Sequence, residues 1–399
     1  MRLFHCGHCG FLVFFESVQC VHCGSTLAFV REHMDVVALQ PVADDDTLWE
    51  RRLPRPGLGE TNENTSNSGV SEEEAPYLRY RMCANRTQYH ICNFALIETP
   101  QTPLNALCSA CQKTRVLPDL SDPLNIRRWG HIETAKRRLY YIDVRLGLDD
   151  LPDERGPVFE FLANLPGSLP VLTGHAAGVI TLNVAEADDD ERARRRLAFH
   201  EPYRTLLGHL RHEIGHYYWD VLIGRAGNQR LEEFRHIFGD ERQDYGQSLE
   251  DYYARTPMPD HAWQNTHVSA YATAHPWEDW AETWAHYLHL MDLLETAKSF
   301  DTEINVPSPL GDRHFTMIDP FIMPPPPFES MLSALVPTTL LLNSLTRSLG
   351  QNDAYPFALS AQALQKMRFV HKVVCEQRIA AASRNAPPQT TQNLPVSDT

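Results

Sequence analysis

The sequence predicts an α+β protein in which small cysteine-rich β modules precede a larger domain with a small sheet and a mainly helical C-terminal half. Eight of the nine cysteines fall into two groups of four within residues 1–111. Short apolar segments between residues 139 and 184 are typical of strands, whereas the segments from 188 to about 297 are typical of helices. The 399 residues, 43% of them hydrophobic, are enough to bury a sizeable core in two or three domains.

Charge and hydropathy exclude two classes of partner. The chain carries 36 basic and 51 acidic residues, a net charge of −15, which argues against the strongly basic face that duplex binding requires. We therefore expect no nucleic-acid partner. No run of about eighteen apolar residues exists, and Cys6 and Cys9 interrupt the apolar stretch near the N-terminus. The sequence thus predicts neither a membrane span nor a secretory signal, and it predicts a cytoplasmic location.

The first cysteine group has the spacing of a zinc ribbon, C-x2-C-x10-C-x2-C, and a glycine follows each pair, as a tight turn around a metal requires. Its members are Cys6, Cys9, Cys20 and Cys23. The apolar residues 11–15 between the pairs predict a strand. Redox-active C-x-x-C motifs or buried apolar cysteines are the alternatives. Four thiolates favour zinc, with rubredoxin-like iron as the alternative, and we assign residues 1–35 to this module.

The second cysteine group is looser, with the spacing C-x8-C-x15-C-x2-C. Its members are Cys83, Cys92, Cys108 and Cys111. Because the last pair is a good half-site, we predict a second structural metal ion in a module at residues 77–120. His90 could replace one cysteine, although a plain polar residue is the simpler interpretation. Residues 60–76 are polar and acidic, which predicts a mobile loop between the modules.

Residues 121–383 have the composition of an ordinary globular domain. The predicted strands cover 139–145, 158–161 and a hairpin of 171–173 with 179–184. The first predicted helical region begins at a capping box at 188–191. Three further helices are predicted, from Pro202 to about 223, over 229–254, and from Pro276 to about 297. A proline run at 324–327 breaks the chain, two shorter helices follow, and residues 384–399 are predicted to be a disordered tail.

One segment of this domain has the sequence of a hydrolytic metal site. His212 and His216 are four residues apart in the motif H-E-x-x-H, so on a helix both imidazoles project from one face and can share a metal ion. Glu213 lies beside them, where its carboxylate can accept a proton from water. The alternative is an amphipathic helix with two ordinary histidines. We assign no metal-binding role to three other histidines nearby, namely His209, His286 and His289.

A catalytic metal needs a third protein ligand, which we expect from a tryptophan-rich segment downstream. Glu278 and Glu282 lie one helical turn apart on the same face of this segment. The tryptophans that flank them are Trp277, Trp280 and Trp284. Carboxylates among tryptophans are unusual on a solvated face, and a buried carboxylate needs a cation or a hydrogen-bond partner. A metal ion and its histidine ligand would supply both.

These motifs resemble those of the gluzincin metallopeptidases, in particular the lethal-factor-like branch, in which H-E-x-x-H is followed at a distance by Y-x6-E-x3-E. The resemblance implies a zincin-like fold with a small sheet above the active-site helix. It further implies that Glu278 is the third zinc ligand, that Glu282 holds a ligand histidine, and that Tyr271 stabilises the oxyanion. The separation of His216 from Glu278 is long for a gluzincin, so Glu282 and Asp279 stay open as third ligands.

Nearly the whole chain resembles one family more closely, the zinc-binding metallopeptidases with an N-terminal zinc-ribbon domain. The matching segments include T-G-H-x-x-G-x-I-T-L-N, R-H-E-I-G-H-Y-Y-W-D and H-P-W-E-D-W-A-E-T-W-A-H-Y-L-H. The resemblance implies hydrolysis of peptide bonds with one catalytic and two structural zinc ions, with Glu213 as general base. The substrate would be a peptide or protein, and the ribbons could recruit a protein partner.

Other interpretations concern the substrate and the function. The strand at 178–184 is predicted to pair through an exposed edge with an extended substrate, with an ordinary hairpin as the alternative. The acidic segment 238–245 could touch substrate or orient a ligand histidine, although a solvated helix with internal ion pairs is simpler. A function of a different class also stays open, an adaptor whose ribbons bind a partner and whose peptidase-like domain is inactive or self-inhibited.

Overall fold

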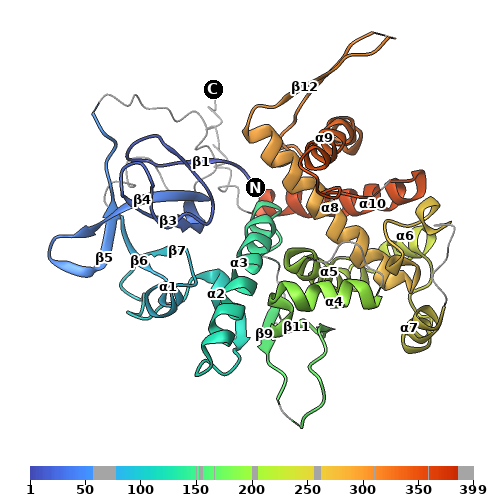
Figure 1. Cartoon of the computed structure of the whole chain (residues 1–399), viewed down its shortest axis with the longest axis horizontal. Helices are drawn as coiled ribbons and strands as arrows, with labels where there is room; N and C mark the ends of the chain where they lie inside the picture. The colour runs from blue at the N-terminus through green and yellow to red at the C-terminus, as the bar shows by residue number, and fades with distance from the viewer. Residues whose placement is uncertain are drawn as a thin grey trace, which may run out of the picture.

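The computed structural model describes the chain except for residues 57–77, 150, 152–155, 166, 200–204, 256–261, 310, 358 and 385–399, and the side chains of 195–199. A β-rich N-terminal part and a mainly helical C-terminal part lie on either side of helix α3 (Pro123–Arg145), as Figure 1 shows. The predicted α+β class is confirmed. The predicted loop at 60–76 and the predicted tail after residue 384 lie outside the described residues.

The N-terminal part is built around a closed barrel that the sequence did not predict. Its strands are β3 (Thr26–Val30), β4 (Asp35–Val42), β5 (Asp45–Arg51), β6 (Arg79–Met82) and β7 (Phe94–Ile97). Sequential strands are antiparallel, and β3 pairs with β7 in parallel to close the barrel. A small hairpin of β1 (Phe4–His5) and β2 (Leu12–Val13) precedes it, so the strand predicted at 11–15 is confirmed in shorter form.

Both faces of the barrel strand β3 are buried. In β3, Ala28 and Val30 pack in one apolar cluster with residues of β4, β6 and β7, whereas Leu27 and Phe29 pack against the cysteine-rich hairpin and α3. Neither face of the strand is therefore polar. A strand of this kind lacks the alternation of polar and apolar residues by which a sequence reveals a half-buried strand.

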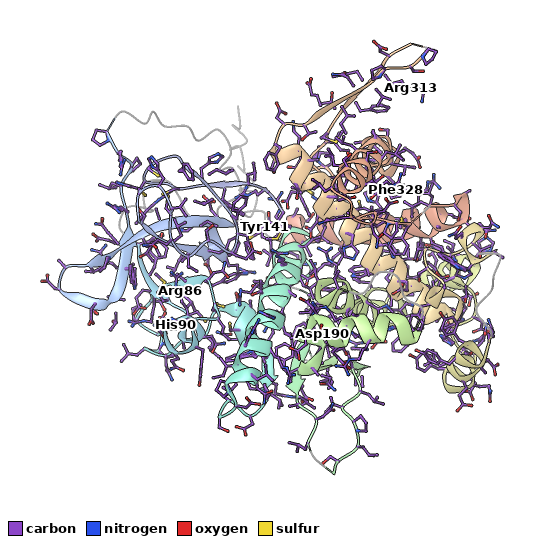
Figure 2. All side chains as sticks on the ribbon, viewed as in Figure 1. Arg86, His90, Tyr141, Asp190, Arg313 and Phe328 are labelled. Carbon is purple, nitrogen blue, oxygen red and sulfur yellow. The ribbon has the colours of Figure 1, made fainter. Side chains whose placement is uncertain are left out.

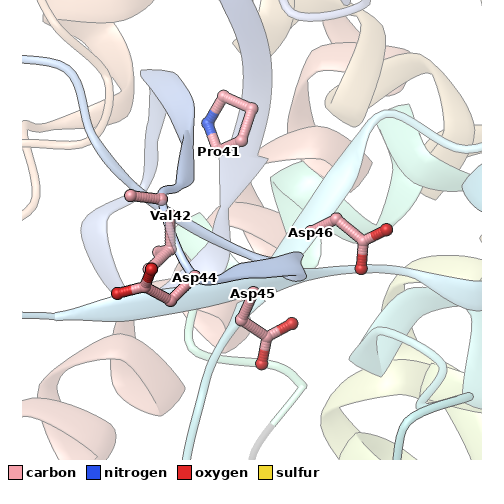
Figure 3. Close-up of a pocket in the computed structure, with 6 residues that line it drawn as sticks. Pro41, Val42, Asp44, Asp45 and Asp46 are labelled. Carbon is pink, nitrogen blue, oxygen red and sulfur yellow. The ribbon is translucent and has the colours of Figure 1, made fainter.

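The turn from β4 to β5 is an acidic tip of the barrel (Figure 3). Asp44 and Asp46 are exposed, and Asp45 accepts hydrogen bonds from the amide and the hydroxyl of Thr47 at 2.9 and 2.7 Å. The three carboxylates point in different directions in Figure 3. This tip is a solvated turn stabilised by local hydrogen bonds.

Helix α3 belongs to two hydrophobic cores. Tyr140 and Tyr141 pack against the barrel, whereas Leu139 and Ile142 pack into the core of the C-terminal part. The strand predicted at 139–145 is therefore wrong, because this stretch forms the last turns of α3. Residues 139–143 are all buried between the two cores, so this stretch lacks the polar face by which a sequence reveals a surface helix.

Tyr141 connects the two parts of the molecule directly (Figure 2). Its ring centroid lies 5.5 Å from that of Phe15 and 6.0 Å from that of Phe29. Its hydroxyl donates a hydrogen bond of 2.7 Å to Glu295, a residue of helix α8 (Pro276–Ser299). Both side chains are buried, so Tyr141 links the core of the N-terminal part to helix α8.

The C-terminal part contains a small sheet with the strand order β10-β11-β9-β8. Its strands are β8 (Thr114–Val116), β9 (Val158–Leu162), β10 (Gly174–Ala176) and β11 (Val179–Asn183). The strand predicted at 158–161 and the hairpin are confirmed, but the first hairpin strand is β10 rather than 171–173. The predicted exposed edge at 178–184 is wrong, because β11 pairs with β10 on one side and β9 on the other. The edge strands of this sheet are β10 and β8.

Helices make up most of the remainder of the C-terminal part. They are α4 (Asp189–Phe199), α5 (Leu206–Trp219), α6 (Asn228–Phe238), α7 (Tyr245–Ala254), α8, α9 (Phe328–Ser348) and α10 (Ala361–Arg384). The predicted helix at 229–254 is two helices, since the side chain of Asp244 caps a new one by accepting from the amide of Gln247. Two helices follow the proline run as predicted, but they are 21 and 24 residues long.

Several boundaries and one hairpin differ from the prediction. Thr205 caps α5 through the amide of Gly208, and Pro202 lies outside the described residues. The helix continues into a π-helical turn, Asp220–Gly224. A hairpin of β12 (Glu303–Val306) and β13 (Arg313–Thr316), which was not predicted, projects at the top of Figure 1.

No helix in the described ranges combines the length and the apolar character needed to cross a membrane.

Helices α5 and α8 approach closely at Gly215, inside the H-E-x-x-H motif. A Cβ atom at Gly215 would lie 3.1 Å from the Cα of Ala281 and 3.3 Å from the Cβ of Trp284. The indole nitrogen of Trp280 donates a buried hydrogen bond to the carbonyl oxygen of Gly215 at 2.9 Å. The glycine lets the two helix backbones meet, and the indole fixes their relative position.

This contact leads to a prediction about stability. Replacing Gly215→Val should force the helices apart and cost about 1–3 kcal/mol of unfolding free energy, as overpacking of a close contact does. Chemical denaturation monitored by tryptophan fluorescence would show a lower midpoint. The control is Gly246→Ala on the exposed face of α7, which should leave the midpoint unchanged or raise it slightly. An unchanged midpoint for Gly215→Val would show that the contact tolerates a side chain.

Candidate metal centres and catalytic site

The cysteines of the first group converge on one point. The sulfur atoms of Cys6 and Cys23 are 3.7 Å apart, as are those of Cys9 and Cys20. Tetrahedral zinc with bonds of about 2.3 Å separates its sulfur ligands by about 3.8 Å, so the four thiols fit this ion. The amide of Gly10 donates to the carbonyl of Cys6 at 2.8 Å, which forms the tight turn predicted around the metal.

The second group fits a tetrahedral ion equally well. The sulfur of Cys92 lies 3.8 Å from that of Cys108 and 3.7 Å from that of Cys111, and all four cysteines of the group are buried. The amide of Cys108 donates to the sulfur of Cys83 at 3.3 Å, a contact that stabilises a thiolate. His90 is exposed on the outer side of this module and does not join the group (Figure 2).

The motif H-E-x-x-H lies on α5, and its two histidines face α8. Their Nε2 atoms are 3.2 Å apart, and the carboxylate of Glu278 lies 3.0 Å from Nε2 of His212 and 3.5 Å from Nε2 of His216. Tetrahedral bonds of about 2.0–2.1 Å separate nitrogen and oxygen ligands by about 3.3–3.4 Å, so these three side chains fit a zinc ion. Glu278 Oε2 is buried without a hydrogen bond to any described residue, as expected of an atom reserved for a cation.

Hydrogen bonds hold these side chains in place. Glu282 accepts from Nδ1 of His212 at 2.7 Å, and Ser269 donates to the second oxygen of Glu282 at 2.6 Å. Burial acts to raise the pKa of Glu282, but the hydrogen bond with His212 outweighs it and lowers the pKa to about 2. Tyr245 donates to Oε1 of Glu278 at 2.6 Å. The ring orientation of His212 and the orientation of the Glu278 carboxylate are therefore both fixed.

The two alternatives for the third ligand have other partners. Glu282 faces the far nitrogen of His212, and Asp279 lies 2.6 Å from the ammonium group of Lys366. Burial raises the pKa of Asp279 to about 7 even though this lysine favours its charged form. Of the three acidic residues considered from the sequence, the one that shares a common point with both histidines is Glu278.

The two residues expected to take part in chemistry lie beside this group. Glu213 is buried, and its Oε1 lies 3.1 Å from Nε2 of His209. The ring centroid of Tyr271 lies 5.8 Å from that of His212. Burial, with the nearby Glu278 carboxylate, raises the pKa of Tyr271 well above its usual value. Tyr271 is therefore a neutral phenol that can donate a hydrogen bond at any ordinary pH.

Comparison with known proteins fits this geometry. A family model described as "Putative zinc-binding metallo-peptidase" matches residues 125–373, and a zinc-ribbon domain model matches residues 3–122. The chain belongs to this family of zinc-binding metallopeptidases. Similar proteins include uncharacterized proteins of Mycobacterium tuberculosis and Mycobacterium bovis, each 37% identical over 383 residues that cover 94% of this chain and 96% of theirs. No solved structure matches the chain.

Four residues around the centre of this metallopeptidase were not assigned a role from the sequence. They are His209, Tyr245, His175 and Trp277, of which Trp277 lies 4.0 Å from His216 and His175 6.2 Å from it, both between ring centroids. Tyr245 is the last residue of the acidic segment 238–245, which was considered as a possible support for a ligand, and this was the one available signal. His209 lies on α5 itself, but its contacts depend on the fold, and His175 and Trp277 come from elements whose approach to α5 only the fold reveals.

Of two histidines set aside from the sequence, His286 is buried in the core, whereas His289 is partly buried. His286 lies 2.8 Å from the hydroxyl of Tyr355, and His289 lies 2.6 Å from the guanidinium of Arg211. Burial lowers the pKa of His286 to about 4, so this imidazole is neutral in the folded protein. Neither side chain belongs to the group formed by the motif histidines and Glu278.

The three groups lead to a prediction about metal content. We expect elemental analysis to find three zinc ions per chain in the wild type and two in the variant His212→Ala/His216→Ala, because each group fits one ion. The variant Cys108→Ser/Cys111→Ser should also lose one ion. Cys375→Ser is the matched control, since this half-buried thiol lies outside both cysteine groups, and it should keep three. Two ions in both the wild type and the histidine variant would contradict the third centre.

Proposed function

We propose that the protein is a zinc-dependent metallopeptidase of the gluzincin type that cleaves peptide bonds with Glu213 as general base. One observation carries this proposal, the convergence of two imidazoles and a carboxylate from α5 and α8 on a point beside Glu213. Three protein ligands with a fourth position left open are the arrangement of catalytic rather than structural zinc. The two cysteine groups, with four protein ligands each, correspond to closed structural sites.

Each side chain of the centre has a distinct task in the proposed reaction. Bound zinc supplies a Lewis acid that makes water acidic near neutral pH and polarises a peptide carbonyl. Glu213 accepts the proton of the attacking water and passes it to the leaving amine. Tyr271 donates a hydrogen bond to the carbonyl oxygen as its negative charge develops. Glu282, by accepting from Nδ1 of His212, keeps Nε2 of that ring unprotonated and free to bind the metal.

The edge strand β10 is the proposed site for the substrate backbone. Its residue His175 stacks 6.2 Å from the ring of His216, so the strand runs beside the centre. An edge strand offers unpaired amides and carbonyls, with which an extended peptide can form a further antiparallel or parallel pair. We therefore propose an extended peptide or protein segment as the substrate.

A further part of the proposal concerns the first ribbon. Its tip exposes large apolar side chains, with Phe14 57% and Val21 87% exposed. Apolar residues exposed on a small module support a role in binding a protein partner, either a substrate or an accessory chain. The net charge of −15 disfavours nucleic acid as that partner.

The role of Glu213 can be tested with one substitution. Glu213→Gln should reduce hydrolysis of an unstructured protein such as casein by at least about 10²-fold, because the amide cannot accept the proton. Zinc content should stay that of the wild type, since Glu213 is not one of the proposed ligands. Glu250→Gln, an exposed position on α7, is the control and should keep full activity. Wild-type activity of Glu213→Gln would show that the base is another group.

The role of Tyr271 can be tested separately. Tyr271→Phe removes the proposed donor but keeps the ring, so kcat should fall by about 10²–10³ while KM stays within about twofold. The measurement is steady-state hydrolysis of a fluorogenic peptide by zinc-loaded enzyme. A rise in KM with unchanged kcat would instead show that Tyr271 binds the substrate without stabilising the transition state.

A further inference from the structure

His209 lies between two carboxylates, those of Glu213 and Glu186. Its Nε2 is 3.1 Å from Oε1 of Glu213, one helical turn further along α5. Its Nδ1 is 2.8 Å from Oε2 of Glu186. No role for this histidine follows from its spacing in the sequence, and the proposed reaction does not use it.

The fold holds Glu186 firmly. This residue lies in a 3-10 turn, Val184–Ala187, that follows β11, and it is 1% exposed. Thr173 donates a hydrogen bond to its second carboxylate oxygen at 2.5 Å, and the guanidinium of Arg192 donates to its main-chain carbonyl at 2.7 Å. Glu186 is thus a fixed acceptor, and the imidazole that contacts it has a fixed orientation.

Hydrogen-bond chemistry restricts the state of the imidazole. An ionised carboxylate can only accept, so an imidazole between two carboxylates satisfies both only if each ring nitrogen carries a proton. The charges around the centre favour the same state. Four carboxylates gather here, from Glu186, Glu213, Glu278 and Glu282. A divalent ion compensates two of these charges, and a cationic His209 compensates a third.

We propose that His209 is a positioning residue that bridges Glu186 and Glu213 as an imidazolium and fixes the carboxylate of Glu213 for proton transfer. One oxygen of Glu213 accepts from Nε2–H of His209, which leaves the other oxygen to take the proton from water. In this arrangement Glu186 orients His209, and His209 in turn orients the reacting group Glu213, as the carboxylate and histidine of a catalytic triad orient its nucleophile. This inference rests on the proposed peptidase function, because it assigns Glu213 the role of general base.

Kinetics of three variants test the bridge. His209→Leu should lower kcat by about 10²-fold with KM and zinc content unchanged, and Glu186→Gln should lower it less. His209→Gln should stay within about tenfold of the wild type, because its amide N–H can donate to Glu213. Combined with Glu213→Gln, His209→Leu should cause no additional loss. His236→Leu, at an exposed position of α6, is the matched control and should keep full activity.

A second measurement does not depend on turnover. In zinc-loaded protein with ¹⁵N-labelled histidines at pH 7, the side-chain signals absent from His209→Gln belong to His209. Both of its nitrogens should carry a proton, and the Nδ1–H signal should shift in Glu186→Gln. A single protonated nitrogen, or a kcat within twofold of the wild type for His209→Leu, would overturn the proposal. If the wild type hydrolyses no peptide, the proposed function fails, and the NMR result still decides whether the bridge exists.

Discussion

The close contact of α5 with α8 is the constraint on which the catalytic centre depends. The histidines lie on one helix and the carboxylates on the other, so the group forms only where the two backbones meet. Gly215 permits this approach, and the indole of Trp280 fixes it through the carbonyl of Gly215. Since Gly215 lies between the two histidines of the motif, the same five residues supply both the ligands and the surface on which the second ligand-bearing helix packs.

Around this contact, hydrogen bonds to other protein groups hold the polar groups of the centre. Glu282 links His212 to Ser269, and Tyr245 holds Glu278. The rings of Trp277 and His175 lie against His216 and surround the centre with apolar surface. Electrostatic interactions are stronger in such an environment, and the side chains need little reorganisation when charge develops.

The sequence predicted the local features of the site well and its long-range features poorly. The histidine pair and Glu213 follow from a spacing within one helix, whereas the carboxylates placed among tryptophans indicate Glu278 and Glu282 together, and only the resemblance to the gluzincins favours Glu278 as the ligand. Strand β3 of the barrel and the end of α3 were missed or misassigned because these segments are buried on more than one side, which removes the periodicity that sequence analysis uses. The contact of His209 with Glu186 joins residues of different elements, and no spacing along the chain reports it.

The shared use of α3 has a consequence for how the two parts could have evolved. A chain lacking the N-terminal part would expose Tyr140 and Tyr141 on one face of α3. Exposing this aromatic surface to water is unfavourable and promotes aggregation. Recombination at the start of α3 would therefore give a destabilised, aggregation-prone product. We expect the two parts to be inherited together, because the barrel and its cysteine groups cover one face of α3 and the C-terminal part packs on the other.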